Sequence, residues 1–186
     1  MNVYGPSFSR IHANRKLGLI PELLPNFIIS FDVFLYDTLY EQKANIIGFS
    51  QSGSNYPEFG SQVPAVFIDK LTQHLSLCMA SGLGTECQIS DTFDLATVYH
   101  EWFNLKIEHR CWGENCYLFG IVNGDVVKVF ATSSGTFNDV EIIFGNTYDQ
   151  EDIIPARGGY ENFKWSAGLD SDDLQFTVSD EPAIEA

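Results

Sequence analysis

The sequence predicts an all-β sandwich, and three observations support that prediction. Residues 102–110 alternate apolar and polar side chains, which is the period of two of a half-buried strand. Two further strands, 117–122 and 125–131, meet at Asn123-Gly124, the residue pair best suited to a type I′ hairpin turn. Along the whole chain, about nine or ten short strands are separated by turn residues, with no long helical period between them.

Strands are also predicted on both sides of this three-strand meander. Apolar side chains alternate most regularly along residues 27–36. Shorter apolar runs, bounded by Gly, Pro, Asn and Ser, predict further strands at 44–50, 64–69, 74–80, 138–145 and 160–165.

Segments rich in breakers predict the connections. Residues 51–63 and 81–88 are predicted loops, and a short helical turn is expected within 91–100. Residues 1–26 contain several Gly and Pro breakers, and this N-terminal segment is expected to pack on the sandwich as an edge strand or a short helical turn. Phe176 and Val178 are candidates for a last edge strand. The predicted divisions are the N-terminal segment, the β-sandwich and an acidic C-terminal tail, at 1–26, 27–166 and 167–186.

The composition argues against two classes of partner. A chain of 186 residues has room for one domain with a full sandwich core. A net charge of −15 would repel nucleic acid and anionic membrane surfaces, so neither is expected as a partner. Solubility is the simplest explanation of this acidity, and a calcium-rich extracellular setting is the alternative. No stretch approaches the roughly 18 consecutive apolar residues of a transmembrane helix, so membrane insertion is not expected.

The four cysteines form two close pairs, Cys78 with Cys87 and Cys111 with Cys116. Each pair flanks a polar, glycine-containing segment, so a disulfide would close a hairpin. Zinc is the alternative, but neither pair has the spacing of a zinc knuckle and no histidine pair lies beside them at ligand spacing. We therefore predict two disulfides and a secreted, extracellular location. A secretory signal would accompany that location, and residues 1–6 lack its charged and apolar regions.

A series of short motifs runs through most of the chain. In order they are Phe31-Asp32, Ile46-Ile47-Gly48-Phe49, Pro64-Ala65-Val66, His74-Leu75-Ser76-Leu77-Cys78, Trp102-Phe103-Asn104-Leu105, Val122-Asn123-Gly124, Phe137-Asn138-Asp139-Val140 and Gly145-Asn146. Their order and spacing, over residues 8–166, resemble laminin-G-like domains, especially the single-domain versions of secreted animal proteins. Laminin-G-like domains belong, with the pentraxins, to the concanavalin A-like lectin/glucanase group.

The resemblance implies an all-β, two-sheet antiparallel jelly-roll sandwich in which one sheet is concave and the ligand loops lie along its rim. Domains of this group often bind calcium at the rim through Asp and Asn oxygens. No loop here reproduces a recognisable pattern of calcium ligands. We therefore leave open whether calcium is a cofactor, and we assign no metal ligand. The rim candidates Asn55, Glu58, Asn146, Asp149 and Asp152 are better explained as turn-forming residues.

Enzymes of the same superfold carry carboxylates at alternate positions of one strand. Asp139 and Glu141 are spaced in this way, but Ile143 stands where a third acid would follow. A solvated strand face is the simpler explanation of these two carboxylates. The sequence has no Gly-x-Ser-x-Gly elbow, and its histidines have no evident Ser or Cys partner. We therefore expect no enzymatic activity.

A carbohydrate site needs an aromatic platform beside planar polar groups. Tyrosines on two predicted loops stand next to Asn, Asp and Glu side chains, and their alternative role is to fold back as lids over the sandwich. The predicted ligand contacts are Asn55, Tyr56, Glu58, Asn146, Tyr148 and Asp149.

The leading functional hypothesis is a secreted, non-catalytic recognition domain that binds a glycan or an extracellular protein partner. The second is a structural subunit of an extracellular assembly or oligomer, because Ile28, Phe34 and Tyr36 are expected to point outward from one strand. A glycoside hydrolase is the third hypothesis.

Overall fold

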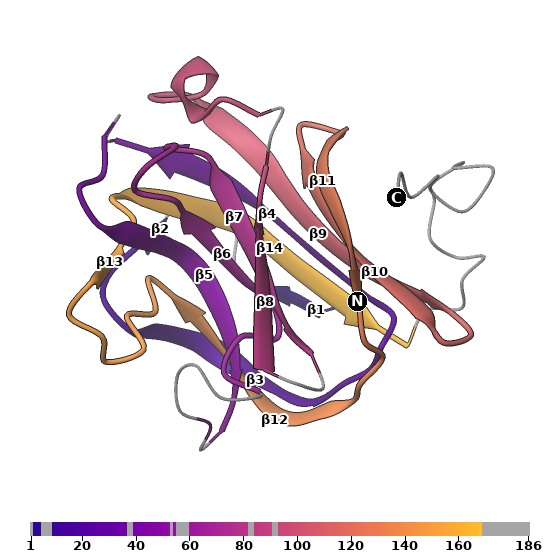
Figure 1. Cartoon of the computed structure of the whole chain (residues 1–186). Helices are drawn as coiled ribbons and strands as arrows, with labels where there is room; N and C mark the ends of the chain where they lie inside the picture. Colours follow the sequence, from indigo (N-terminus) through magenta and orange to yellow (C-terminus); the bar gives the residue numbers. More distant parts are fainter. Residues whose placement is uncertain are drawn as a thin grey trace.

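The structure of the chain, a computed structural model, is a sandwich of two β-sheets packed face to face (Figure 1). It describes residues 2–4, 9–36, 39–52, 54, 60–81, 84–90 and 93–168. These ranges contain fourteen strands and one short 3-10 turn, Leu95–Thr97, so the predicted all-β class is confirmed. Within the same ranges, no helix has the length and apolar character needed to cross a bilayer.

Sheet A contains the strand predicted at 27–36, the meander and the last described strand. Its neighbours are all antiparallel. In order across the sheet, its strands are β1 (Asn2–Tyr4), β14 (Gly158–Ala167), β4 (Phe27–Leu35), β9 (Trp102–Trp112), β10 (Asn115–Val122) and β11 (Asp125–Thr132), and β2 (Ser9–Arg10) also pairs with β14.

Sheet B contains the remaining strands and lies on the other side of the core. Its path is antiparallel, and one short strand joins it in parallel. In order, its strands are β3 (Arg15–Leu23), β12 (Phe137–Phe144), β5 (Lys43–Gln51), β6 (Ala65–Ile68), β7 (Leu75–Ser81) and β8 (Gly84–Ile89), with β13 (Ile153–Pro155) parallel to β5.

The meander predicted from the alternating pattern is confirmed as β9, β10 and β11. Asn123 and Gly124, which connect β10 to β11, have φ values of 51° and 93°. Both values lie in the left-handed region that a type I′ turn requires. Local sequence was therefore enough to specify this hairpin.

One connection differs from the prediction made from sequence. The predicted loop at 81–88 is wrong, because Gly84–Ile89 forms β8 and pairs with β7. Polar side chains dominate β8, so it lacks the apolar alternation that revealed the other strands, and pairing with β7 specifies it instead. Of the two alternatives for the N-terminal segment, the structure shows the edge strand, β3, which pairs with β12. The strand expected around Phe176 and Val178 lies outside the described residues.

Both predicted disulfides, Cys78–Cys87 and Cys111–Cys116, are present. In each bond the two cysteines are register partners on neighbouring strands, β7 with β8 and β9 with β10. The disulfides therefore cross-link two hairpins at positions where strand pairing already holds the cysteines face to face.

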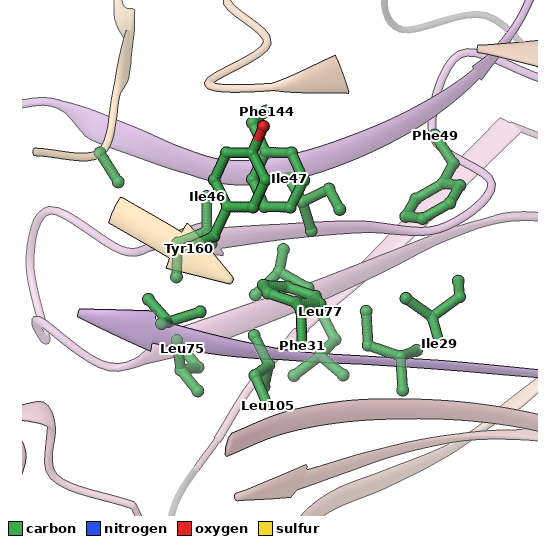
Figure 2. Packing of buried hydrophobic residues seen from close by; sticks show 14 of the residues in the cluster. Ile29, Phe31, Ile46, Ile47, Phe49, Leu75, Leu77, Leu105, Phe144 and Tyr160 are labelled. Carbon is green, nitrogen blue, oxygen red and sulfur yellow. The ribbon is translucent and has the colours of Figure 1, made fainter. Parts of the chain in front are cut away.

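Alternate side chains of both sheets meet in one apolar core (Figure 2). Phe31 of β4 is fully buried there, and Phe144 of β12 stacks on Tyr160 of β14 with ring centroids 3.5 Å apart. At Gly120 the sheets approach so closely that a Cβ would lie 2.6 Å from Leu77 Cδ2. Because the core takes one face of each strand, the other face turns outward, and the candidate sites lie on these outer faces.

Candidate functional site: a polar groove on the outer face of sheet B

A groove of about 410 Å³ crosses the outer face of sheet B. Its floor is formed by β3, β12 and β5, and residues 146–150, which follow β12, form a wall. Hydroxyl, amide and charged side chains dominate the lining, and side chains of these kinds can all donate or accept hydrogen bonds. The lining residues are Asn14, Lys16, Ser50, Gln51, Ser52, Ser54, Glu141, Ile143, Asn146, Tyr148, Asp149 and Gln150.

Strand alternation places the side chains of the floor. In β12, Val140 and Ile142 turn into the core, so Glu141 and Ile143 turn outward. Ser50 of β5 is the register partner of Glu141 and lies beside it on the same face. The side chains of the groove floor are thus those that β12 and β5 turn away from the core.

An ion pair joins β3 to β12 across the floor. Lys16 Nζ lies 2.7 Å from Glu141 Oε1, and the two side chains are 63% and 26% exposed. A pair this accessible to water contributes little to stability. It does hold an ammonium donor and a carboxylate acceptor side by side at the surface, where a ligand with adjacent hydroxyls can bind both.

Amide side chains hold the wall in place. Asn45 Oδ1 accepts a hydrogen bond from the Asn146 amide at 2.8 Å, and Asn146 Oδ1 accepts one from the Tyr148 amide at 2.9 Å. Asn14 Oδ1 accepts from the Thr147 amide at 2.9 Å. Asn146 is only 5% exposed, so its main role in the structure is to fix the wall.

The wall turns through strained backbone. Tyr148 and Asp149 are consecutive non-glycine residues with φ values of 51° and 54°. This left-handed conformation is unfavourable for residues with a Cβ, and neighbouring contacts must maintain it. At Gly145, where φ is 64°, a Cβ would lie 2.6 Å from the His12 carbonyl oxygen, so the turn into the wall needs glycine.

Tyr148 combines packing with contact to the groove. Its hydroxyl lies over Gly48, where an added Cβ would be only 2.2 Å away. Its ring centroid lies 6.0 Å from that of Phe67, in a small apolar cluster that also contains Ala65 and Ile153. Of the two roles considered for this tyrosine, the structure shows the lid, and the half-buried ring still lines the groove.

A second cation lies close to the same cluster. Lys43 Nζ lies 4.0 Å from the centroid of the Phe67 ring, within the range of a cation–π contact. Burial lowers the pKa of Lys43, while Asp69 and Asp152 act in the opposite direction. Burial alone would raise the pKa of Asp69, but hydrogen bonds that include one from the Thr72 amide outweigh it and lower that pKa.

The structure brings part of the predicted contact set together. Asn146, Tyr148 and Asp149 all line the groove. The floor residues Lys16 and Ser50 were missed, because the prediction considered loops and these side chains come from strands. The sequence did carry a signal for them, because residues that alternate with buried residues along a strand must face outward. The other predicted contacts, which lie outside the described residues, are Asn55, Tyr56 and Glu58.

The described side chains of the groove offer few carboxylates to a calcium ion. Calcium takes about six to eight oxygen ligands. In the groove, Glu141 is already bound to Lys16, and Asn146 Oδ1 already accepts a hydrogen bond from the Tyr148 amide. Asp149 is the other carboxylate among the described lining residues, so these residues hold no cluster of free carboxylates of the kind that binds calcium tightly.

One group of three metal-type side chains occurs in the described part of the chain, namely His109, Cys111 and Cys116. The two cysteines form a disulfide, so they offer no thiolate. His109 Nδ1 contacts the Pro25 carbonyl oxygen, and its Nε2 lies 2.7 Å from Thr132 Oγ1. Burial lowers the pKa of His109, although the contact with Pro25 acts to raise it. Because the cysteines are bonded to each other and both ring nitrogens of His109 have protein partners, this largely buried cluster has a structural role.

Comparison with known proteins identifies the fold. No family and no curated protein sequence matches the chain. Among solved structures, the native heptameric SAP-like pentraxin from Limulus polyphemus matches with a TM-score of 0.56 and 9% identity, over 85% of this chain and 74% of the pentraxin. The chain has a concanavalin A-like jelly-roll fold.

A second match covers almost the whole of both chains. The CBM40 of the Ruminococcus gnavus IT-sialidase, bound to alpha2,3 sialyllactose, matches with a TM-score of 0.55 and 11% identity, over 91% of this chain and 96% of its own. Another structure of this CBM40 has a TM-score of 0.53 and 9% identity, over 90% and 96%. The predicted jelly-roll fold is confirmed, and membership of the superfamily and of its laminin-G type stay predictions.

Proposed function

We propose that this chain is a secreted, non-catalytic recognition domain that binds a glycan in the groove of sheet B. The observation that carries the proposal is the lining of that groove, in which hydrogen-bonding side chains surround about 410 Å³ of space beside the ring of Tyr148. Lys16 supplies donors, Glu141 supplies acceptors and the Ser50 hydroxyl supplies both. Such a mixture suits a ligand that carries many hydroxyl groups.

Fold and covalent structure support the same class of function. The SAP-like pentraxin and the CBM40 bound to sialyllactose share this architecture, and their likeness counts as an analogy. Two disulfides are typical of proteins in oxidising compartments, which supports a secreted location.

The non-catalytic part of the proposal rests on the floor of the groove. Glu141 is bound by Lys16 at 2.7 Å, and the apolar Ile143 is the next outward residue along β12. Glycoside hydrolysis needs two carboxyl groups placed on either side of the scissile bond. Hydrolysis of β-glucans by the wild-type protein that disappears in Glu141→Gln would contradict this part of the proposal.

A glycan array probed with and without calcium tests the binding itself. For a glycan that binds, Lys16→Ala is expected to weaken the affinity by about tenfold, because it removes a charged hydrogen-bond donor. Lys70→Ala is the matched control, since Lys70 is an exposed lysine outside the groove. An array that stays blank in both conditions, together with a blank pull-down from native source fluid, would reject the recognition function.

The alternative function is a structural subunit of an extracellular assembly. The observation that favours it is the outward direction of Phe34 and Tyr36 on sheet A, where Tyr36 is 41% exposed. Size-exclusion chromatography with light scattering separates the two functions in part, because a strictly monomeric protein at micromolar concentration argues against self-assembly.

A further inference from the structure

The outer face of sheet A carries a cluster of aromatic side chains at one end of β4 and β9. Phe34 lies at its centre, with its ring centroid 5.2 Å from Tyr36, 5.6 Å from Trp102 and 6.5 Å from His100. Tyr36 and Trp102 are 41% and 43% exposed. Exposed aromatic groups that gather in this way mark a binding surface more often than isolated ones do.

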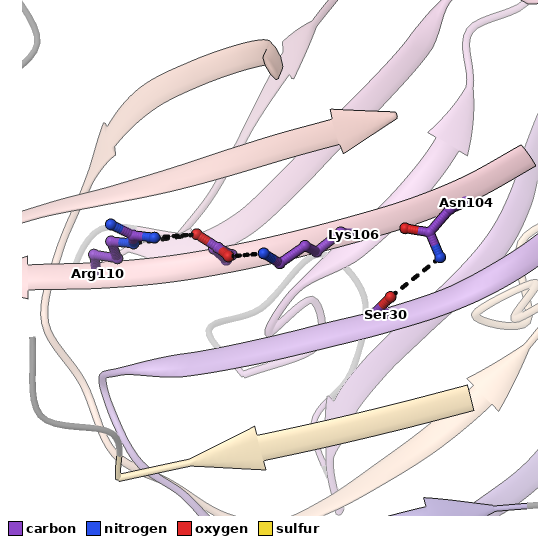
Figure 3. A network of polar contacts seen from close by, with 5 residues as sticks. Ser30, Asn104, Lys106 and Arg110 are labelled. Atoms are coloured by element: carbon purple, nitrogen blue, oxygen red, sulfur yellow. Dashed lines mark hydrogen bonds and ion pairs between the residues drawn. The ribbon is translucent and has the colours of Figure 1, made fainter. Parts of the chain in front are cut away.

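A polar network adjoins the aromatic cluster on the same face. Asp32 of β4 and Asn104 of β9 are register partners, one outward row away from the Phe34 and Trp102 pair. Asn104 Nδ2 donates to Asp32 Oδ1 at 2.9 Å. It also donates to Ser30 Oγ at 3.2 Å, the contact that Figure 3 shows. The carboxylate of Asp32 is thereby held in a fixed orientation at the surface.

A β-bulge supplies the third member of this network. The register of β14 with β4 shifts between Glu161 and Lys164, and Asn162 has a φ of 54°. In regular alternation Asn162 would face the opposite side from Glu161, whereas here its Nδ2 donates to Asp32 Oδ2 at 2.7 Å. Bulges commonly re-aim a side chain in this manner at functional positions.

The charges on this face favour a neutral ligand. Further along β9, Lys106 and Arg110 both contact Glu108, and Arg110 Nη2 lies 2.6 Å from Glu108 Oε2 (Figure 3). These cations are therefore engaged by a buried carboxylate. Lys164, the register partner of Ser30, is an exposed cation on the same face. However, Asp32, its register partner Glu161 and the net charge of −15 outweigh it and would repel an anionic ligand.

We propose that the aromatic cluster and the Asp32 network form a second binding site, for a neutral oligosaccharide chain. Apolar sugar faces would pack on the exposed rings of Trp102 and Tyr36. Sugar hydroxyls would donate to the lone pairs of Asp32 that its two amide partners leave open. The aromatic and polar rows are two strand residues apart, or about 6.6 Å, so a chain that lies along β4 contacts both. This site is separate from the groove, because it lies on the other sheet.

Titration with neutral hexasaccharides of glucose, mannose and xylose tests the proposal, with tryptophan fluorescence and calorimetry as readouts. We expect at least one hexasaccharide to bind. Trp102→Ala should weaken that binding by about tenfold or more, because it removes the main apolar platform, and Asp32→Ala should weaken it as well. Trp112→Ala is the matched control, since Trp112 is 42% exposed and lies at the other end of β9. Lys16→Ala changes the groove and should leave this binding intact.

Three results would overturn the proposal. The first is that no hexasaccharide binds the wild-type protein. The second is that Trp102→Ala and Trp112→Ala lose the same amount of affinity. The third is that the wild-type protein is a dimer and that Trp102→Ala converts it to a monomer. The last result would make the cluster a protein interface. Melting temperatures of the two tryptophan variants show whether a loss of binding comes from misfolding, and Trp102→Phe, which keeps an aromatic face, should retain most of the affinity.

Discussion

Replacing Gly48 with alanine tests how closely Tyr148 lies against the outer face of sheet B. The added Cβ would lie 2.2 Å from the tyrosine hydroxyl oxygen and 3.1 Å from its Cζ. The ring cannot move freely, because it packs against Phe67 with centroids 6.0 Å apart. Overpacking of this kind typically costs about 1–3 kcal/mol, and we expect Gly48→Ala to lower the free energy of unfolding by about 2 kcal/mol.

Removing the ring should remove the clash. Tyr148→Ala alone should cost about 2 kcal/mol, less than the loss of a fully buried aromatic side chain, because Tyr148 is only partly buried. In the Tyr148→Ala background, Gly48→Ala should cost close to nothing, because the preference for alanine over glycine in a strand, about 0.5–1 kcal/mol, offsets the remaining tight contact with Asn146 Cβ at 3.3 Å. A double-mutant cycle from urea denaturation should therefore show a coupling energy of about 2 kcal/mol.

Gly135→Ala is the control for this cycle, because the nearest atoms to its added Cβ lie at an ordinary contact distance of 3.4 Å. It should change the free energy of unfolding little. If the effects of Gly48→Ala and Tyr148→Ala add to within about 0.5 kcal/mol, the tyrosine does not rest on Gly48 and the structure of the groove wall is different.

Burial lowers the pKa of His109 in the folded chain. Below pH 6.5 the unfolded chain therefore binds more protons at this residue than the folded chain does. As the pH is lowered from 6.5, the free energy of unfolding should decrease until the pH reaches the pKa of the folded chain. His109→Gln should flatten that fall in urea titrations, and an unchanged slope, or an equal effect of the exposed His12→Gln, would argue against it. Glu108 is 1% exposed and binds two cations. Glu108→Gln should therefore lower the free energy of unfolding by about 3 kcal/mol, and a decrease of less than about 1 kcal/mol would contradict a buried ion pair. Replacing both Cys111 and Cys116 with serine should lower the free energy of unfolding by about 2 kcal/mol, because the disulfide closes a short loop. Free thiols at these positions in non-reducing peptide mapping would disprove the bond.

Local patterns in the sequence were sufficient for most of the strands and for both disulfides. Alternation marked β4 and β9 because one face of each is buried, and the Asn123-Gly124 turn followed from the backbone freedom of those two residues. The close cysteine pairs followed because hairpin partners are near in sequence. Where burial was weak, as in the polar edge strand β8, the pattern failed, because an edge strand with an exposed face has no apolar alternation to show.

Only the tertiary structure decided the binding surfaces. Lys16, Ser50 and Glu141 meet in the groove because β3, β12 and β5 are neighbours, although they are far apart along the chain. The contact of Tyr148 with Gly48 and the turn of Asn162 toward Asp32 depend on a strained wall and a bulge. Local propensity reports which face of a strand is buried, whereas strand order and register come from packing across the whole sandwich, and these place the outward side chains beside one another.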